Sequence, residues 1–166
     1  VSALAISGIS SRSFSFEGFL PSDKNEKKQI LTELADESRT IILYEAPHRL
    51  IKTLKEIFEY LGDRRVSIVR ELTKLHEEVL RGNLSNIIAD YELGRVAVRG
   101  EYVLVIEGKS LLEKRNERQK SFEEISIKEH FDKYISEGLD KKEAMKAVAK
   151  DRGIQKREVY KELLGE

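Results

Sequence analysis

Cysteine is absent from this sequence of 166 residues, and proline occurs only twice. Without cysteine the chain can form no disulfide framework, no thiolate zinc site and no cysteine nucleophile, and a reducing compartment is permitted. No run approaches the roughly 18 apolar residues of a membrane-spanning helix, and the first residues lack the pattern of a secretory signal peptide. We therefore expect a cytoplasmic protein without a membrane partner, and no metal site is predicted.

A large charge of one sign is lacking as well. Lys plus Arg and Asp plus Glu number 30 each, so the formal net charge is zero. The chain as a whole therefore has no field that attracts nucleic acid or an acidic partner, and any basic surface must be local. The length allows one ordinary domain, or a compact domain of about 110 residues followed by a small appendage.

Strand patterns and helix patterns alternate over the first 108 residues. Runs typical of strands occur in SFSFEGFLP (13–21), TIILY (40–44), RVSIVREL (65–72), the beginning of EEVLRGNLSNIIADYEL (77–93) and GEYVLVIEG (100–108). TIILY is a continuous apolar run, which predicts a strand that is covered on both sides. Helical spacing occurs in 22–38 with Ser22 or Asp23 as N-cap, in 47–61, and in the rest of 77–93 with Asn83 or Ser85 as cap. This alternation predicts a layered α/β domain.

The composition changes after Gly108. KSLLEKRNERQKS (109–121) is nearly all charged or amide residues, which is typical of a linker or an exposed helix. Three short helical patterns follow and no strand pattern, and the last carries Ile154, Val159, Leu163 and Leu164 inward. We expect an α/β domain in 1–109, a charged linker in 110–121 and a helix-turn-helix-like bundle in 122–166.

The segment LYEAPHRLIKTL (43–54) joins a strand to a helix and concentrates polar groups at the junction. Pro47 suits the first helical position, and the free N–H groups of the helix then point out of the carboxyl edge of a strand, where open α/β sheets place ligands. Glu45 adds a carboxylate, His48 an imidazole and Arg49 a planar donor fork. Alternatively, Glu45 only complements the helix dipole, and the two basic residues form a solvated helix face.

Charged residues also follow the next strand and precede the last one. IVRELTKLHEE (68–78) places five of them directly after apolar residues: Arg70, Glu71, Lys74, His76 and Glu77. Before the last strand, Arg99 and Glu101 flank Gly100, and a glycine there permits close approach of the backbone to a ligand. The alternative at both places is a set of ordinary surface ion pairs.

Four motifs, in this order and spacing, carry a resemblance to a known family: FEGFLP (16–21), YEAPHRL (44–50), RELTKLHEE (70–78) and GEYVLVIEG (100–108). The chain resembles the bacterial 16S rRNA (cytidine-2′-O)-methyltransferases of the tetrapyrrole methylase superfamily. The resemblance covers the whole chain. ALAISGI (3–9) is similar to the segment that follows the family's Pro-Gly-x-Ser-Ala stretch, and the terminal bundle resembles the family's small helical domain.

The resemblance implies a fold, a reaction and partners. It implies the C-terminal domain of the tetrapyrrole methylase fold, which is an α/β domain with a mixed sheet flanked by helices, followed by a small helical bundle. Nothing in the sequence matches the family's N-terminal domain, so we expect a C-terminal fragment that is inactive alone. The implied reaction is S-adenosylmethionine-dependent 2′-O-methylation of a cytidine in 16S ribosomal RNA or the small ribosomal subunit, by a homodimer whose cofactor lies between the two domains.

Transfer of a sulfonium methyl to a ribose 2′-hydroxyl requires alignment, removal of a weakly acidic proton and exclusion of water. The predicted catalytic residues are Glu45 and His48 near the methyl group, and Glu71 and Lys74 near the RNA. The predicted cofactor-binding residues are Tyr44, Ala46, Pro47, Gly100 and Glu101. The predicted RNA-binding residues are Arg49, Arg70, Lys156, Arg157 and Lys161.

Two other functions stay open. A tetrapyrrole or diphthamide methyltransferase of the same superfamily is one, but it does not explain YEAPHRL or the helical tail. The other is a nucleic-acid-binding module, in which the terminal bundle contacts phosphate through Lys156, Arg157 and Lys161 and the α/β part is a scaffold. Residues 126–166 hold ten Lys or Arg against nine acidic residues, which argues against tight binding by the bundle alone.

Overall fold

The computed structural model describes residues 1–72 and 77–164. Lys74 and His76, both named above, lie outside the described residues. The chain divides into two compact units, Val1–Lys109 (unit 1) and Ser110–Glu166 (unit 2). Each unit is described by itself.

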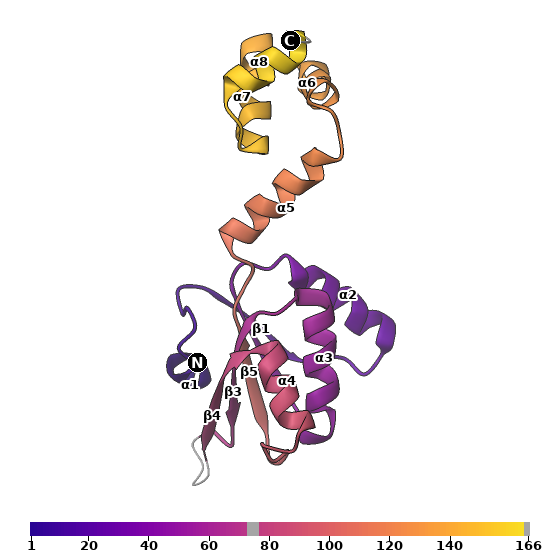
Figure 1. Ribbon diagram of the computed structural model, residues 1–166. Helices are drawn as coiled ribbons and strands as arrows, with labels where there is room; N and C mark the ends of the chain where they lie inside the picture. The colour runs from indigo at the N-terminus through magenta and orange to yellow at the C-terminus, as the bar shows by residue number, and fades with distance from the viewer. Residues whose placement is uncertain (73–76, 165–166) are drawn as a thin grey trace. The chain divides into compact units, whose positions relative to one another are not determined.

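Unit 1 is built on a five-stranded sheet (Figure 1). The strands are β1 (Phe14–Phe19), β2 (Thr40–Glu45), β3 (Arg65–Arg70), β4 (Glu78–Asn83) and β5 (Tyr102–Ile106), in the order β1-β2-β5-β3-β4. β1 and β2 are parallel, whereas the other neighbours are antiparallel. The predicted fold class, an α/β arrangement with a mixed sheet, flanking helices and further helices after it, is confirmed.

Three helices cover one face of this sheet, as Figure 1 shows: α2 (Lys24–Ala35), α3 (Leu50–Leu61) and α4 (Leu84–Glu92). Their apolar residues form the main core with alternate strand residues, such as Leu54 of α3 with Leu43 and Leu104 of the central strands. The short helix α1 (Ser2–Ser7) packs on the other face, over β3, β4 and β5. On that face Phe14 and Phe16 of β1 and Tyr44 near the end of β2 stay exposed.

Local chemistry explains where the helices of unit 1 begin. Asp23 caps α2, because its carboxylate accepts hydrogen bonds of 2.9 Å from the N–H groups of Asn25 and Glu26. The helix predicted from Pro47 starts with the 3₁₀ turn η1 (Pro47–Arg49), and α3 follows at Leu50. The 3₁₀ geometry arises because the N–H of Arg49 bonds to the carbonyl of Ala46, three residues back, at 3.1 Å.

The cap of α4 comes from a residue distant in sequence. Asn83, one of the two residues predicted as N-cap, occupies that position, but its side chain makes no capping bond. Asp63 supplies the acceptor instead: its carboxylate accepts from the N–H of Ser85 at 2.9 Å and from the Ser85 hydroxyl at 2.8 Å. The N–H of Ser85 is the largest cause that lowers the pKa of Asp63 below its ordinary value.

Two arginines tie the elements of unit 1 together. The side chain of Arg64 is buried and donates to the carbonyls of Ala35 at 2.6 Å and Leu61 at 3.0 Å, the last residues of α2 and α3. Arg81 of β4 donates to the carbonyl of Ser7 at 3.0 Å, at the end of α1. Because helix ends leave their last carbonyls without intrahelical partners, these guanidinium groups satisfy acceptors that would otherwise need water.

Unit 2 consists, over its described residues, of four helices: α5 (Leu111–Glu123), α6 (Ile127–Ser136), α7 (Lys141–Arg152) and α8 (Lys156–Leu164). The charged segment predicted as a linker or an exposed helix lies in α5. Val148 and Val159 are fully buried at the centre of the unit. Leu164, predicted to point inward, is 55% exposed because it lies in the last turn of α8. None of the helices in 1–72 and 77–164 is long and apolar enough to span a membrane.

Candidate functional site

A cavity of about 320 Å³ lies where β2 ends and β5 begins. Its lining residues are Phe19, Tyr44, Glu45, Leu72, Glu101, Tyr102 and Val103. Because β2 and β5 are antiparallel, the carboxyl end of one meets the amino end of the other, and Glu45 pairs with Tyr102 across the ladder. Three residues predicted for the site, Tyr44, Glu45 and Glu101, are thus brought together from two distant segments.

Aromatic side chains extend from this cavity over the open face of the sheet. A neighbouring cavity of about 300 Å³ shares Tyr44, Leu72 and Val103 with the first and is also lined by Phe14 and Phe16. The ring centroids of Phe16 and Tyr44 are 5.1 Å apart. The alternate phenylalanines predicted a strand, but not that their face lies open.

The prediction that both faces of TIILY are covered is wrong at its last residue. Tyr44 is 40% exposed, whereas Ile41, Ile42 and Leu43 are buried. Side chains alternate between the faces of a strand, and Tyr44 points to the face that carries α1. α1 packs mainly on β3, β4 and β5, and the Tyr44 ring stays partly exposed at this end of β2.

Glu45 points to the opposite, helix-covered face and is only 1% exposed. One of its oxygens accepts from the N–H of Ala46 at 2.8 Å, and the other accepts from the hydroxyl of Thr53 at 2.6 Å. The guanidinium Nε of Arg49 lies 3.4 Å from the first oxygen, and Nη2 of the same group donates to the carbonyl of Leu20 at 2.8 Å. The carboxylate therefore fastens the end of β2 to η1, to α3 and, through Arg49, to the segment after β1.

Arg70 lies in the same row of the sheet as Glu45. Tyr102 is the ladder partner of both residues, so the three cross the sheet in the order Glu45, Tyr102, Arg70. Arg70 is 8% exposed, and its guanidinium forms an ion pair of 2.8 Å with Glu78 on β4. Tyr91 of α4 is a neighbour of Tyr102. Burial is the largest cause that raises the pKa of Tyr91, and the Tyr102 hydroxyl raises this pKa further.

Glu71 occupies the space beside Gly100. Its backbone is left-handed, with φ of 50°, and its carboxylate accepts from the N–H of Glu101 at 2.9 Å. A Cβ added to Gly100, whose φ is 76°, would clash with that carboxylate. The close approach predicted at Gly100 is thus made here by the Glu71 side chain, and the predicted contact of Gly100 with a cofactor stays a prediction.

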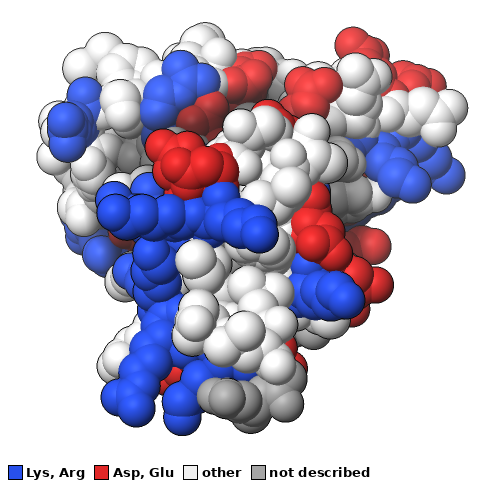
Figure 2. All heavy atoms as spheres, turned by 90° about the horizontal axis from the view of Figure 1, so that it is seen from above, with Lys and Arg blue, Asp and Glu red and all other residues white. Residues whose placement is uncertain are grey.

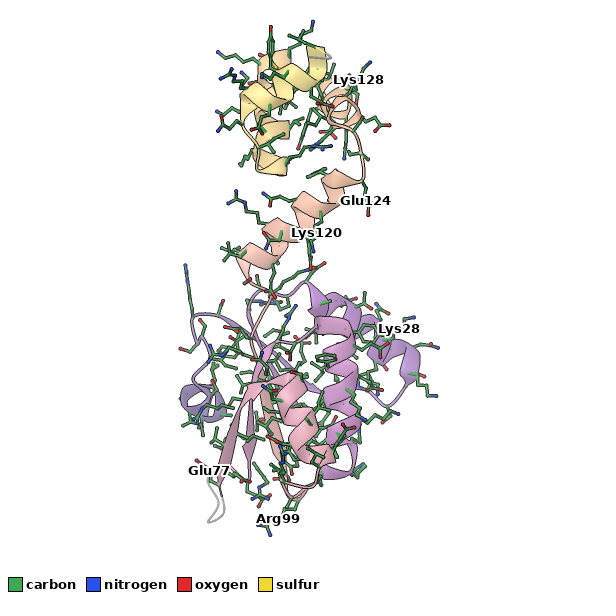
Figure 3. The ribbon with its side chains drawn as sticks, in the orientation of Figure 1. Lys28, Glu77, Arg99, Lys120, Glu124 and Lys128 are labelled. Carbon is green, nitrogen blue, oxygen red and sulfur yellow. The ribbon has the colours of Figure 1, made fainter. Side chains whose placement is uncertain are left out.

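The other predicted residues are distributed over both units. His48 is exposed on η1, and Ala46 and Pro47 beside it are partly buried. Lys156, Arg157 and Lys161 are exposed on α8 of unit 2. Figure 3 shows Glu77 and Arg99 at the end of the sheet where β5 begins, and Figure 2 shows positive and negative side chains interspersed over the face in view. Among the described residues, no group of three or more His, Asp and Glu side chains is placed to hold a metal ion.

Comparison with known proteins links the chain to a protein family. The family model of the tetrapyrrole (corrin/porphyrin) methylases matches residues 2–88. The chain is 46% identical over 160 residues to the ribosomal RNA small subunit methyltransferase I of Bacillus subtilis, covering 96% of this chain and 54% of that protein. It is 37% identical over 161 residues to the protein of the same name from Synechocystis, covering 96% and 55%. The chain therefore spans about half the length of these relatives.

Among solved structures, the chain is similar to a cobalt precorrin-4 methyltransferase of cobalamin biosynthesis, with 20% identity and a TM-score of 0.46. That match covers 63% of this chain and 46% of the other.

Proposed function

The chain belongs to the tetrapyrrole methylase family, and from this premise we propose that it takes part in S-adenosylmethionine-dependent 2′-O-methylation of a cytidine ribose in 16S ribosomal RNA. Relatives named ribosomal RNA small subunit methyltransferase I support ribosomal RNA as the substrate. Because the chain spans about half of their length, we propose that it supplies half of the cofactor and substrate cleft.

One structural observation supports this proposal. Tyr44 and Glu45, from the motif YEAPHRL, and Glu101, from the motif GEYVLVIEG, line a single cavity at one end of the sheet. Motifs that are distant in sequence and meet at a cavity indicate a site rather than a set of unrelated surface charges.

The cavity suits one wall of a site for S-adenosylmethionine, the methyl donor of this family. When bound, this cofactor supplies an electrophilic methyl group on a sulfonium. The aromatic rings of Phe19 and Tyr44 and the apolar side chain of Val103 line the cavity and are suited to contact an adenine ring. A volume of about 320 Å³ lies at the low end of ligand sites, which run from about 300 to 1,000 Å³. Such a small volume is expected if the chain forms only half of the cleft.

His48 is the residue that we propose accepts the proton of the ribose 2′-hydroxyl. Its imidazole is exposed on η1, three residues after Glu45 of the cavity lining, and an imidazole exchanges protons near neutral pH. The Glu45 carboxylate holds the same turn through its contacts with the N–H of Ala46 and the guanidinium of Arg49. We propose that Glu45 acts mainly as a positioning residue, and its role in accepting a proton stays a prediction, as does that of Glu71.

The remaining partners and the location are also proposals. The small ribosomal subunit is the proposed partner, homodimerisation is implied by the resemblance, and a cytoplasmic location follows from a ribosomal substrate. Sedimentation of the purified chain at several concentrations would test the dimer.

The test of the function joins the chain to the N-terminal half of the Bacillus subtilis relative. The fusion and the chain alone are each incubated with radiolabelled S-adenosylmethionine and small ribosomal subunits. We expect the fusion to label the RNA and the chain alone not to. The labelled linkage should resist alkali, because the 2′-hydroxyl that would attack the phosphate is blocked by the methyl group.

Each component of the proposal has an outcome against it. Robust labelling by the chain alone would overturn the split cleft, and an alkali-labile linkage would overturn 2′-O-methylation. A fusion that binds RNA without transferring methyl groups would favour the nucleic-acid-binding module. Transfer to a tetrapyrrole instead of RNA would favour the other branch of the family.

A further inference from the structure

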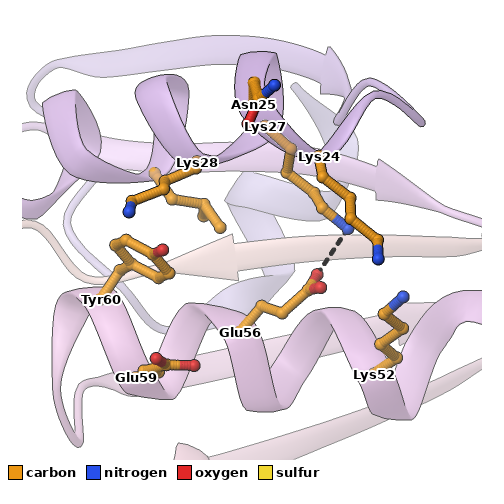
Figure 4. A pocket seen from close by; sticks show the side chains of 9 residues that line it. Lys24, Asn25, Lys27, Lys28, Lys52, Glu56, Glu59 and Tyr60 are labelled. Carbon is orange, nitrogen blue, oxygen red and sulfur yellow. Dashed lines mark ion pairs between the residues drawn. The ribbon is translucent and has the colours of Figure 1, made fainter.

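A groove lined by lysines lies between α2 and α3, away from the cavity described above. Its volume is about 400 Å³, and its lining residues are Lys24, Asn25, Lys27, Lys28, Leu31, Lys52, Glu56, Glu59 and Tyr60. Figure 4 shows the lysines of α2 along one wall, and Lys52, Glu56, Glu59 and Tyr60 of α3 along the other. The two walls are fixed because Leu31 of α2 and Leu54 of α3 belong to the main core.

The lysines of this groove fall into two kinds. Lys27 is only 8% exposed, and its ammonium forms an ion pair of 2.7 Å with Glu56 across the groove, drawn as a dashed line in Figure 4. Lys24, Lys28 and Lys52 are exposed, and their ammonium groups form no ion pair or hydrogen bond within the described part of the chain. Lys27 is thus structural, whereas the other three are available to an external anion.

The clustering is local and is not a property of the whole unit. Residues 1–109 contain 16 Lys or Arg and 17 Asp or Glu, so unit 1 has almost no net charge, yet four of its seven lysines line this groove. Lys55, three residues after Lys52 on α3, forms an ion pair of 2.5 Å with Glu92 of α4. Among the residues that line the groove, Lys24, Lys28 and Lys52 outnumber Glu59, the one exposed acid. Like charges that face one another destabilise a surface slightly, and an anion that lies between them lowers this cost.

We propose that this groove binds the phosphate backbone of the RNA, an inference that rests on the proposed function. The free ammonium groups come from both walls, and in Figure 4 Lys24 and Lys52 lie at one end while Lys28 lies beside Tyr60 at the other. An extended chain of phosphates can contact ammonium groups at both ends of the groove. The Tyr60 ring, partly exposed in the groove, gives a base a surface for stacking. Lysine contacts to phosphate position the RNA without reading its sequence.

The test measures RNA binding by the chain rather than methyl transfer, so it does not require a complete enzyme. A fluorescent RNA hairpin is titrated with the chain by anisotropy, between about 50 and 200 mM salt. The variants are Lys52→Gln, Lys55→Gln as the matched control on the same helix, and the triple variant Lys24→Gln, Lys28→Gln, Lys52→Gln. Thermal unfolding of each variant checks that the fold is kept, which we expect because the three lysines are exposed and their ammonium groups form no ion pair or hydrogen bond with the described residues.

Each phosphate contact contributes about 0.7–0.9 to the slope of log K against log salt, or about threefold in affinity over that fourfold range of salt. We expect Lys52→Gln to reduce the magnitude of this slope by about 0.7–0.9, the value of one contact. The triple variant should reduce it by about three times as much, whereas Lys55→Gln should leave it unchanged. Glu59→Gln, which removes an acid from the groove, should tighten binding.

Two outcomes would overturn the inference, and they differ in what they leave standing. If the chain binds the hairpin but the triple variant has the same slope as Lys55→Gln, the groove is not the RNA surface and the proposed function is unaffected. If the unmodified chain does not bind RNA even at low salt, the groove proposal fails, and ribosomal RNA as the substrate loses its support from this half of the protein.

Discussion

Replacement of Glu45 by alanine tests how the junction between β2 and α3 is held. The carboxylate is 1% exposed and has three partners: the N–H of Ala46 at 2.8 Å, the hydroxyl of Thr53 at 2.6 Å and the guanidinium of Arg49 at 3.4 Å. Truncation leaves the N–H and the Thr53 hydroxyl, on a residue that is 2% exposed, without this acceptor. It also removes the buried counter-charge of Arg49.

The size of the effect follows from these contacts. A hydrogen bond to a charged group contributes about 1.5–3 kcal/mol, and removal of one member of a buried ion pair costs about 3–5 kcal/mol. The Arg49 side chain is 26% exposed, so water can solvate part of its charge. The three contacts also share one carboxylate, so their contributions do not add. We expect Glu45→Ala to lower the free energy of unfolding of unit 1 by about 3 kcal/mol, and Glu45→Gln, which keeps the shape and an acceptor, by about 1 kcal/mol.

Amide hydrogen exchange is the suitable assay. The helices of unit 2 also contribute to far-ultraviolet circular dichroism, so bulk melting of the chain need not be a two-state process. The slowest amides of β2 and β5 report the global opening of unit 1 alone. The control is Glu59→Ala, an exposed residue on α3, which should change stability by less than about 0.5 kcal/mol. If Glu45→Ala falls within the same limit, the carboxylate does not hold the junction and the reasoning is refuted.

The glutamine variant also distinguishes the two roles of Glu45 in the fusion enzyme. A positioning role predicts that Glu45→Gln lowers turnover moderately and lowers stability with it, because η1 loosens. A role in accepting the proton predicts, besides the same loss of stability, a loss of turnover far larger than the loosening of η1 explains. The ratio of the two effects therefore decides between them.

Elements whose cause is local could be predicted from the sequence. The β-branched run before Glu45 predicted β2, and the pair Ser22 and Asp23 predicted the start of α2, which Asp23 caps, because a strand pattern and a capping side chain act within a few residues. Tyr44, Glu45 and Glu101, which the motifs single out, line one cavity, and that this cavity is the functional site stays a prediction.

Side-chain environments that depend on tertiary contacts could not be predicted in the same way. The cap of α4 comes from Asp63, 22 residues from Ser85, and no local pattern indicates that distance. The direction of the Glu45 side chain, in contrast, has a local signal in the sequence. Counting by two from Ile41 and Leu43 places Glu45 on the helix-covered face, where its carboxylate needs internal partners.

Three further predictions concern separate parts of the chain. In the fusion enzyme, His48→Ala should lower turnover about 10²-fold, the low end for a general base, with little change in the unfolding midpoint because His48 is exposed. On unit 2, the double variant Lys156→Glu, Arg157→Glu should weaken RNA binding and lower the salt slope by about 1.5, because two phosphate contacts are lost; an unchanged slope would remove α8 from the RNA surface. The last concerns Asp63, whose carboxylate caps α4 through the N–H of Ser85 at 2.9 Å. Asp63→Ala should lower the stability of unit 1 by about 1 kcal/mol at neutral pH. The folded state lowers the pKa of Asp63, so the stabilisation is present above the unfolded pKa of about 3.9 and is lost as the pH falls through the lower folded value. The difference between the unmodified chain and the variant, measured by hydrogen exchange, should therefore shrink below about pH 4; a difference that stays constant down to the folded pKa would show that the charge of Asp63 does not contribute to the cap.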